Sequence, residues 1–386
     1  MTISADWSQV TEYDLRGDES GGSEDEEQPE SWTATTWCLK KKGEGEGYGY
    51  EKCGEQQKVQ PPNPPVLKEL RDYPGQWQRC VRVRVLLLVG SPVVSTIESG
   101  AGEREPALRN ISDTARWAAY FRAQETKRED ALFRDPYAER LAGARGTEIA
   151  NTLPEGNKHE WAWVARTYLF DQFIAKEIAE GTDLVVNLAA GLDARPYRMK
   201  LPAALQWTEI DLPEPLTYKE LVLANEKPVC ALERIRLDLA NPPARRALFA
   251  QLNARAKKAL VLTEGLLIYL TPEEVGELAK DLAACGNFHA WITDLSSPGL
   301  LRMMQRTSGK ELSKAGAPFK FGPMEGPGFF APFGWRAADV QGLLKTAARF
   351  GRPPLFLRVM AKLPEPKRPA GSRPWSGVCL LKRALA

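Results

Sequence analysis

The sequence predicts an α/β fold built on a mostly parallel, doubly wound sheet. From about residue 108 onward, short apolar runs alternate with longer amphipathic segments, as strands and helices do in a parallel sheet with right-handed crossovers. The first apolar run ends in a small-residue turn, in VVNLAAGLDARPYRM (185–199), which is typical of a strand, a tight loop and a helix. The last two apolar runs have no long helix between them, which indicates an antiparallel end to the sheet.

Helix boundaries are marked by capping residues. Ser112 is a suitable N-cap for a helix through SDTARWAAYFRAQETKR. A long helix through HEWAWVARTYLFDQFIAKEIAE is expected to end before Gly181, a good C′ residue. Asn241, which two prolines follow, is expected to cap a later helix. In TPEEVGELAKDLAAC, Thr271 and Glu274 have the spacing of a capping box.

Strands are expected where β-branched and aromatic residues form short runs between turn signals. A helix is expected within GWRAADVQGLLKTAARFG (334–351), before the closing pair of runs. The expected strands are 184–189, 204–211, 234–239, 259–265 and 288–295, and the closing β-rich runs are 354–360 and 375–382.

Residues 1–104 differ in composition from the rest of the chain. They contain an acidic run (17–30), a stretch rich in glycine and charge (40–57) and a proline break (61–66). Without sustained amphipathic periodicity, this segment is predicted to be a disordered, low-complexity extension of a domain at 105–386. A regulatory tail, a dispensable extension and a mis-assigned translation start all remain open; the next methionine after Met1 is Met199.

The composition limits the classes of function. A net charge of +2 gives no general attraction to nucleic acid or to an anionic membrane, so neither partner is expected, although local patches are not excluded. Six cysteines without a C-x-x-C pair and only two histidines argue against a metal site. No signal peptide is visible, and VLLLVGSPVVS (85–95) is too short to span a bilayer, so a cytoplasmic protein with reduced thiols is expected.

The turn after the first predicted strand does not have a dinucleotide-binding sequence. A G-x-G-x-x-G fingerprint uses glycines to seat a pyrophosphate against the backbone. Here Gly191 stands alone, with Ala189 and Ala190 before it and Ala194 three positions after it. The turn therefore favours close approach by a ligand that carries no phosphate.

Acidic residues stand at the ends of the following strands. Glu209 and Asp211 lie 18 and 20 residues after Gly191, where a carboxylate can accept both hydroxyls of a ribose. Asp238 and Glu264 end or follow later strands. Because the carboxyl ends of parallel strands share one edge, these acids predict a ligand site there, and they suit a ligand with positive charge.

These segments together resemble one family. ISDTARWAAYFRAQETKREDALFRDPYAERLAG, R-x-Y-x-F-D, NLAAGLDARPYRM, EIDLPE, RLDLANP, TEGLLIYLTPEEV and FFAPFGW occur in the order and spacing of the leucine carboxyl methyltransferase-like family, in its bacterial branch. The resemblance covers about 108–386. It implies a Rossmann-like class I methyltransferase fold, a seven-stranded sheet with an antiparallel last strand, extra N-terminal helices, and S-adenosyl-L-methionine (SAM) as methyl donor.

The resemblance also implies roles for individual residues. Gly191 would lie under the methionine part of SAM, Arg166 would pair with the methionyl carboxylate, and Glu264 would lie near the sulfonium. Asp211 would hold the ribose hydroxyls. The sequence departs from the family at Ala189, where glycine is more common; a methyl group fits there if the backbone keeps a negative φ.

The adenine contacts that the resemblance implies come from the turn after the third strand. Asp238 would accept a hydrogen bond from the adenine amino group, and Leu239 would pack beside it.

The expected activity is O-methylation of a carboxylate or hydroxyl of a small metabolite. A carboxylate is ionised at neutral pH and needs no general base, whereas a hydroxyl needs one. His159 and Tyr168 are the candidates for that base, and neither is assigned the role. Residues 296–335 are expected to form part of the acceptor wall. Phe329, Phe330 and Trp335 either line the acceptor pocket or pack in the core.

Four other functions remain open. Within the family, the alternative is methylation of a protein C-terminal carboxylate. A SAM-binding regulator without catalysis is an alternative of another class. A nucleotide-dependent oxidoreductase is disfavoured by the missing glycines. Nucleic-acid methylation is disfavoured because 105–386 contains neither an asparagine–proline–aromatic motif nor a basic arm.

Overall fold

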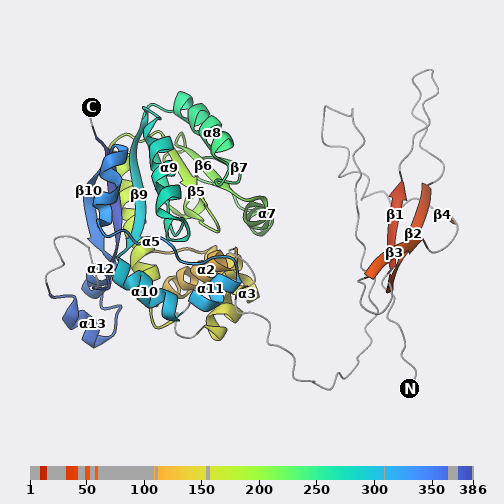
Figure 1. Ribbon diagram of the computed structural model, residues 1–386, viewed down its shortest axis with the longest axis horizontal. Helices are drawn as coiled ribbons and strands as arrows, with labels where there is room; N and C mark the ends of the chain where they lie inside the picture. The colour runs from red at the N-terminus through yellow and green to blue at the C-terminus, as the bar shows by residue number, and fades with distance from the viewer. Residues whose placement is uncertain are drawn as a thin grey trace. The chain divides into compact units, whose positions relative to one another are not determined.

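The computed structural model describes residues 108, 112–153, 157–307, 309–363 and 373–384, together with four strands between residues 9 and 59. The chain divides into two units, Met1–Gly102 and Glu103–Ala386 (Figure 1). Among the described residues, no helix combines the length and the apolar character that crossing a bilayer requires.

The first unit contains a small antiparallel sheet. Strand β2 pairs with each of the other three strands. None of these strands is among the elements expected from the sequence, and the division into an extension at 1–104 and a domain at 105–386 stays a prediction. The strands are β1 (Gln9–Asp14), β2 (Trp32–Lys41), β3 (Tyr48–Lys52) and β4 (Gln57–Val59).

The second unit is built on a seven-stranded sheet of order β10-β11-β9-β8-β5-β6-β7. The neighbours from β9 to β7 are parallel, whereas β11 is antiparallel to both β9 and β10. The predicted α/β class with an antiparallel last strand is therefore confirmed. The strands are β5 (Leu184–Leu188), β6 (Gln206–Asp211), β7 (Ala231–Arg236), β8 (Ala259–Thr263), β9 (Phe288–Ser296), β10 (Trp335–Gly342) and β11 (Ser376–Arg383).

Helices cover both faces of this sheet, and alternate residues of each strand face opposite layers. Val186 of β5 packs with α8 and α9, whereas its neighbour Val185 packs with α5 and α12. A further layer of α2, α3, α10 and α11 lies at one end of the sheet (Figure 1). The helices are α2 (Ser112–Thr126), α3 (Ala138–Thr152), α5 (Glu160–Ala179), α6 (Arg195–Arg198), α7 (Pro213–Val222), α8 (Pro242–Arg255), α9 (Pro272–Ala283), α10 (Pro298–Thr307), α11 (Gly309–Lys314), α12 (Leu343–Arg349) and α13 (Leu355–Met360), with 3-10 turns η1 (Leu267–Tyr269) and η2 (Gly326–Phe333).

The capping predictions hold for three helices, whereas Ser112 is the first residue of α2 itself. The Asn241 side chain accepts a hydrogen bond from the Ala244 N–H at 3.2 Å. Thr271 and Glu274 form the reciprocal bonds of a capping box. Gly181, just after α5, has a φ of +97°, the left-handed conformation that ends a helix at little cost.

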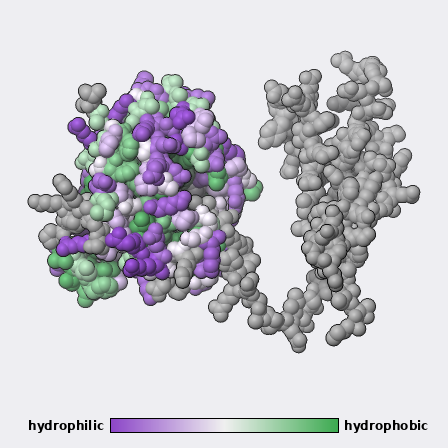
Figure 2. Space-filling model, viewed as in Figure 1, coloured by the Kyte–Doolittle hydropathy of each residue, from purple (hydrophilic) through white to green (hydrophobic). Residues whose placement is uncertain are grey.

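One element prediction near the C-terminus is wrong, and one strand was not expected. The expected helix within 334–351 is α12, which begins at Leu343, but the first half of that segment forms strand β10, which ends at Gly342. The run 354–360 forms α13 and not a strand. A short apolar run is compatible with the periodicity of a helix as well as with that of a strand. Pro354, directly before the helix, favours a helix start. The hydrophobic side chains of α13 form a surface cluster at the lower left of Figure 2.

Candidate functional site

The loop after β5 meets the end of β6, as the sequence predicted. Gly191 has a φ of +47° and donates its N–H to Asp211 Oδ2 at 2.6 Å. Asp211 Oδ1 accepts the Leu212 N–H at 2.7 Å. Burial raises the pKa of the Asp211 carboxyl above its ordinary value, although the two N–H donors oppose that rise. This carboxylate therefore stands at the carboxyl edge of the sheet, directly beside the glycine turn.

Ala189 does not have the negative φ at which its methyl group would fit without strain. Its φ is +51°, and it is the one residue other than glycine with positive φ in the part of the chain that the structure describes. A Cβ clashes with the backbone in this conformation. The loop therefore keeps the geometry of a glycine at this position and carries local strain.

Helix α2 closes over the loop. A Cβ placed on Gly191 would lie 3.3 Å from the Ala115 Cβ. Arg122 of the same helix donates from Nη2 to the Leu192 carbonyl at 2.6 Å and from Nε to Asp135 at 2.8 Å. The extra N-terminal helices thus form one wall of the site.

Arg166 and Glu264, two of the predicted residues, are in direct contact. Arg166 Nε donates to Glu264 Oε1 at 3.1 Å, and its Nη1 lies 3.4 Å from Asp294 Oδ2. Asp294 also accepts the Gly265 N–H at 2.7 Å. Burial lowers the pKa of Arg166, but the charges of Asp294 and Glu264 outweigh it and raise that pKa overall. Burial raises the pKa of Asp294.

Sequence reasoning missed Asp294. It lies in β9, within the predicted strand 288–295. The rule that singled out the acids of earlier strand ends applies to it equally, so the signal was present.

Arg195 connects this pair to the glycine loop, and sequence reasoning missed it as well. It is 3% exposed and donates to Asp171 at 2.7 Å, to Asp193 at 2.9 Å and to Glu264 at 2.8 Å. Burial opposes the charged guanidinium, but the three carboxylates raise the pKa of Arg195 well above its ordinary value. The same contact keeps the pKa of Asp193 low despite burial. Arg195 therefore fixes the loop against α5 and β8.

Glu209 has a different role from Asp211. Its carboxylate is fully buried and accepts Lys219 Nζ at 2.8 Å and Arg234 Nε at 2.9 Å. Arg234 also donates to the Tyr197 hydroxyl at 2.7 Å. This network joins β6 to α7 and β7 in the interior, so of the two acids in β6 it is Asp211 that stands at the loop.

Asp238 and Leu239 form the turn after β7, beside the end of β6. The Leu237 N–H donates to the Asp211 carbonyl at 2.9 Å, which ties this turn to the site. The exposed Asp238 carboxylate accepts the Ala240 N–H at 2.9 Å, and the Leu239 carbonyl accepts Arg245 Nη1 at 2.8 Å. Their adenine-binding role stays a prediction.

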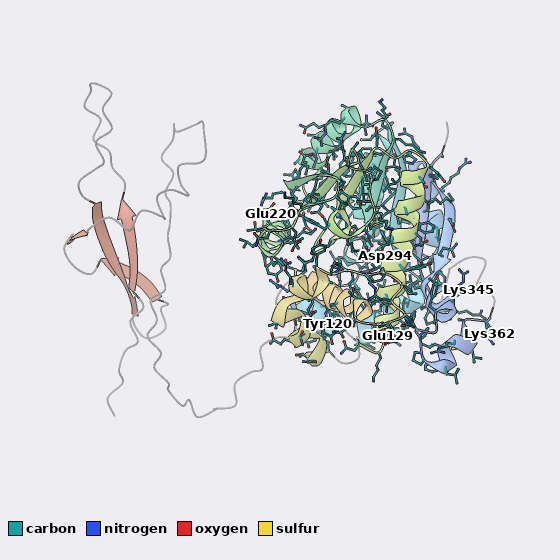
Figure 3. All side chains as sticks on the ribbon, turned by 180° about the vertical axis from the view of Figure 1, so that it is seen from behind. Tyr120, Glu129, Glu220, Asp294, Lys345 and Lys362 are labelled. Atoms are coloured by element: carbon teal, nitrogen blue, oxygen red, sulfur yellow. The ribbon has the colours of Figure 1, made fainter. Side chains whose placement is uncertain are left out.

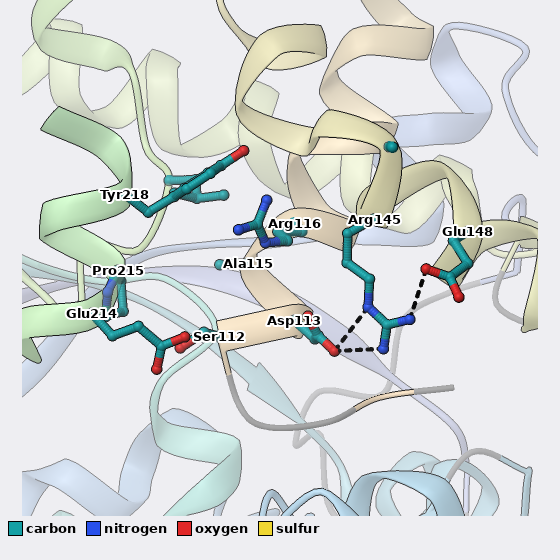
Figure 4. A pocket seen from close by; sticks show the side chains of 11 residues that line it. Ser112, Asp113, Ala115, Arg116, Arg145, Glu148, Glu214, Pro215 and Tyr218 are labelled. Atoms are coloured by element: carbon teal, nitrogen blue, oxygen red, sulfur yellow. Dashed lines mark hydrogen bonds and ion pairs between the residues drawn. The ribbon is translucent and has the colours of Figure 1, made fainter. Parts of the chain in front are cut away.

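A pocket of about 420 Å³ opens between α2, α3 and α7 (Figure 4). Ala115 and Leu192 belong to its lining, so it adjoins the glycine loop. Arg145 pairs with Asp113 and Glu148 on one side. On the other side the Arg116 guanidinium lies 3.7 Å above the Tyr218 ring. The pocket is thus polar and carries charges of both signs.

Neither candidate for a general base has a hydrogen bond or ion pair with the described residues of the site. His159 is exposed just before α5, and Tyr168 packs edge-on against Phe350 at 5.1 Å. The other histidine, His289, bonds the Ala259 carbonyl and Glu177, at the opposite, amino end of β8. The phenol beside Arg166 is Tyr269, and burial raises its pKa, so it stays protonated at neutral pH.

The aromatic residues considered for the acceptor wall belong to the core. Phe330 and Trp335 are fully buried and pack edge-on against Trp291. Phe329 is partly buried against the same cluster. Within the described ranges, no three histidine, cysteine or carboxylate side chains are grouped as metal ligands would be.

Comparison with known proteins yields one family. The sequence model of the leucine carboxyl methyltransferase family matches residues 115–283. A Frankia alni protein named "Putative S-adenosyl-L-methionine-dependent methyltransferase" is 33% identical over 267 residues, which are 66% of this chain and 91% of the relative. A Streptomyces coelicolor protein with the same description is 34% identical over 254 residues, 62% of this chain and 88% of the relative.

Among solved structures, a DUF574 family protein from Streptomyces avermitilis superposes with a TM-score of 0.45 and 11% identity. The alignment covers 70% of this chain and 97% of that one.

Proposed function

The chain belongs to the leucine carboxyl methyltransferase-like family of SAM-dependent methyltransferases, and we propose that it methylates an oxygen atom of a small metabolite, a carboxylate or a hydroxyl. As a member of this family it is an enzyme that uses SAM as methyl donor. The proposal concerns the acceptor and the roles of individual residues.

The residues at the carboxyl edge of the sheet fit the donor. Asp211 presents a carboxylate beside the glycine turn, where ribose hydroxyls would donate to it. Glu264 and Asp294 offer negative charge for a cationic ligand, and Arg166 offers a guanidinium for a carboxylate. When bound, SAM supplies a methyl group that its sulfonium already activates. The protein's share of the work is then to orient the reactants and to exclude water.

The side chains that surround the loop support one kind of acceptor. His289 lies at the opposite end of β8, His159 is exposed before α5, and Tyr269 is protonated at neutral pH. A hydroxyl acceptor would need a base at this place, whereas a carboxylate is ionised without one. This observation supports a carboxylate as the preferred acceptor group.

Transfer of a tritiated methyl group tests the proposal. The full-length protein is incubated with labelled SAM and, in separate reactions, with small carboxylic acids, with small alcohols and phenols, and with peptides that end in a free carboxylate. Methyl esters release volatile methanol in mild alkali, whereas methyl ethers do not. Alkali-labile label in a small acid is the expected result. Label confined to peptides would support the protein-carboxyl alternative, and SAM binding without transfer to any acceptor would favour the regulator.

A further inference from the structure

Helix α13 is amphipathic, and its apolar face points outward. Five large apolar side chains, Leu355, Phe356, Val359, Met360 and Leu363, are between 53% and 74% exposed. At 100° per residue they fall within an arc of about 140°, since backbone hydrogen bonds continue the turn to Leu363. The opposite face, with Leu357 and Ala361, is half-buried. A helix that packs on a globular core has the reverse arrangement.

Basic side chains flank this apolar face. A hollow of about 500 Å³ lies between α12 and α13, and Lys345, Arg349, Arg358 and Lys362 line it together with Leu355 and Val359. Figure 3 shows Lys345 and Lys362 on these two neighbouring helices. Residues 343–363 contain five basic residues and no acidic one.

One cation of this segment is engaged elsewhere. Arg352 pairs with Glu125 at 2.7 Å and with Asp130 at 2.6 Å, and these two acids come from the end of α2 and the turn after it. Arg358 donates to the carbonyls of Pro353 and Gly351, so its guanidinium keeps its full charge beside the hollow. The patch is therefore both apolar and positively charged, although the net charge of the whole chain is only +2.

We propose that the α12–α13 surface (residues 343–363) docks on an anionic membrane surface. The exposed Leu, Phe, Val and Met side chains would enter the boundary between headgroups and acyl chains, and the lysines and arginines would meet lipid phosphates in the hollow. Exposed leucines that stand alone, such as Leu221 on α7 at 73%, are ordinary in proteins. A contiguous apolar face with cations along its edge is not.

A bilayer fits this surface better than an acidic protein partner does. The apolar side chains protrude from a convex helix, as do those of interfacial helices that insert one face into a bilayer. On this surface a band of basic side chains adjoins a band of apolar side chains, just as lipid headgroups adjoin acyl chains in a membrane.

Vesicle flotation tests the proposal with the full-length chain. At low salt, the protein should float with vesicles of equimolar phosphatidylcholine and phosphatidylglycerol, but not with phosphatidylcholine alone. Lys345→Gln/Lys362→Gln should lower the affinity about 30-fold, because each cation near such a surface contributes about a factor of five. Phe356→Ser/Val359→Ser should abolish flotation.

Matched controls separate this surface from non-specific adhesion. Leu221→Ser removes an equally exposed apolar side chain on α7, and Lys227→Gln/Lys257→Gln removes two exposed charges elsewhere; both should float like the wild type. SAM affinity, measured by calorimetry, should be the same in all variants, which shows that they fold.

Three outcomes would overturn the proposal. One is a wild-type protein that floats with neither kind of vesicle, or with both equally. Another is an equal loss in the control variants. The third is a self-associating wild type whose association, and not its lipid binding, is lost in Phe356→Ser/Val359→Ser, because that would make a second copy the partner of this surface.

Discussion

At the scale of single residues, the turn after β5 combines two left-handed residues with a buried carboxylate. Gly191 adopts its φ of +47° at little cost, whereas Ala189 pays a steric penalty at +51°. Backbone strain of this kind persists where surrounding contacts fix the chain. Here those contacts are the Asp211–Gly191 hydrogen bond and the anchoring of the following segment by Arg195.

Replacing the strained alanine should stabilise the protein. Ala189→Gly relieves about 1–2 kcal/mol of αL strain and adds about 0.4–1 kcal/mol of unfolded-chain entropy. The free energy of unfolding in urea should therefore rise by about 0.5–1 kcal/mol. Ala190→Gly is the matched control, because Ala190 is buried and has no positive φ; it should lower that free energy by about 1 kcal/mol. A loss of stability in both variants would contradict the assigned geometry.

Removing the carboxylate at the loop should weaken donor binding. Asp211→Ala should reduce SAM affinity about 10- to 150-fold, the equivalent of about 1.5–3 kcal/mol of charge-assisted hydrogen bonding. Isothermal titration calorimetry measures it directly. Glu233→Ala, which removes an exposed pair with Arg255, should leave the affinity unchanged. An unaltered affinity in Asp211→Ala would refute the ribose assignment.

The same residue predicts how SAM binding depends on pH. Ribose hydroxyls donate best to an ionised carboxylate, and burial raises the pKa of Asp211. As the pH falls, protonation should therefore weaken binding at a higher pH than for an ordinary aspartate, and above that pKa the affinity should level off. The pKa of Asp294 is also raised, so calorimetry across pH must compare Asp211→Asn with Asp294→Asn. Should Asp211→Asn keep the wild-type profile, Asp211 is not the titrating group.

At the scale of elements, a buried ion network connects β6, α7 and β7. Glu209 and Lys219 are both fully buried, and Arg234 completes the set at 14% exposure. Removing one member leaves its partner as a buried charge without a counter-charge. The network is therefore a structural device beside the site and not part of the donor contacts.

A double-mutant cycle tests whether Glu209 and Lys219 stabilise the fold as a pair. Glu209→Leu leaves Lys219 as an unpaired buried cation and should cost about 3–5 kcal/mol of unfolding free energy. The double variant Glu209→Leu/Lys219→Met should recover much of that loss, because an apolar pair needs no counter-charge. Arg234 keeps its hydrogen bond to the Tyr197 hydroxyl. Urea denaturation of Glu209→Leu, of Lys219→Met and of the double variant measures the coupling. Additive losses would show that the two side chains do not depend on each other.

Local signals predicted most of the elements and several of the site residues. Asn241, Thr271 and Glu274 cap helices through neighbours in the sequence, so their patterns were readable. That Gly191 and Asp211 lie at the same edge of the sheet followed from their places at the ends of predicted parallel strands, although the hydrogen bond between them was not predicted. The boundary between β10 and α12 was not predicted, because the pairing of β10 with β11 determines where the strand ends.

Contacts between distant segments lay beyond the sequence. Arg195 reaches Asp171 and Glu264, residues 24 and 69 positions away, and no spacing rule connects them. The positive φ of Ala189 is likewise imposed by its surroundings and not by its own preference. The apolar face of α13 points to solvent because the rest of the domain packs against the other side of the helix, and the sequence of the helix does not show which side that is.

At the scale of the whole molecule, the site and its supports all belong to the second unit. The carboxyl ends of β5, β6 and β8 supply the residues that we propose to face the donor, and α2 and α5 supply Arg122 and Arg166. The unit Glu103–Ala386 also includes the α12–α13 surface. A shortened chain that keeps these elements should therefore keep the chemistry.

Truncation tests that expectation. A chain of residues 105–386 should bind SAM with the affinity of the full-length protein, as calorimetry would show. A cut at 112 removes Leu108, which is 1% exposed and packs with Trp117 and Phe121 of α2. Loss of this side chain should cost about 1.5–3 kcal/mol of unfolding free energy and lower the melting temperature of the shorter chain.

The two truncated chains together locate the boundary of the working enzyme. Equal SAM affinity in 105–386 and in the full chain, with reduced stability only in 112–386, would make residues 1–104 dispensable for donor binding. Weaker binding by 105–386 would instead assign part of the donor site to residues 1–104. Because α2 carries Ala115 against the glycine loop, a cut that loosens α2 should raise the SAM dissociation constant as well as lower stability, so affinity and melting temperature should fall together in 112–386.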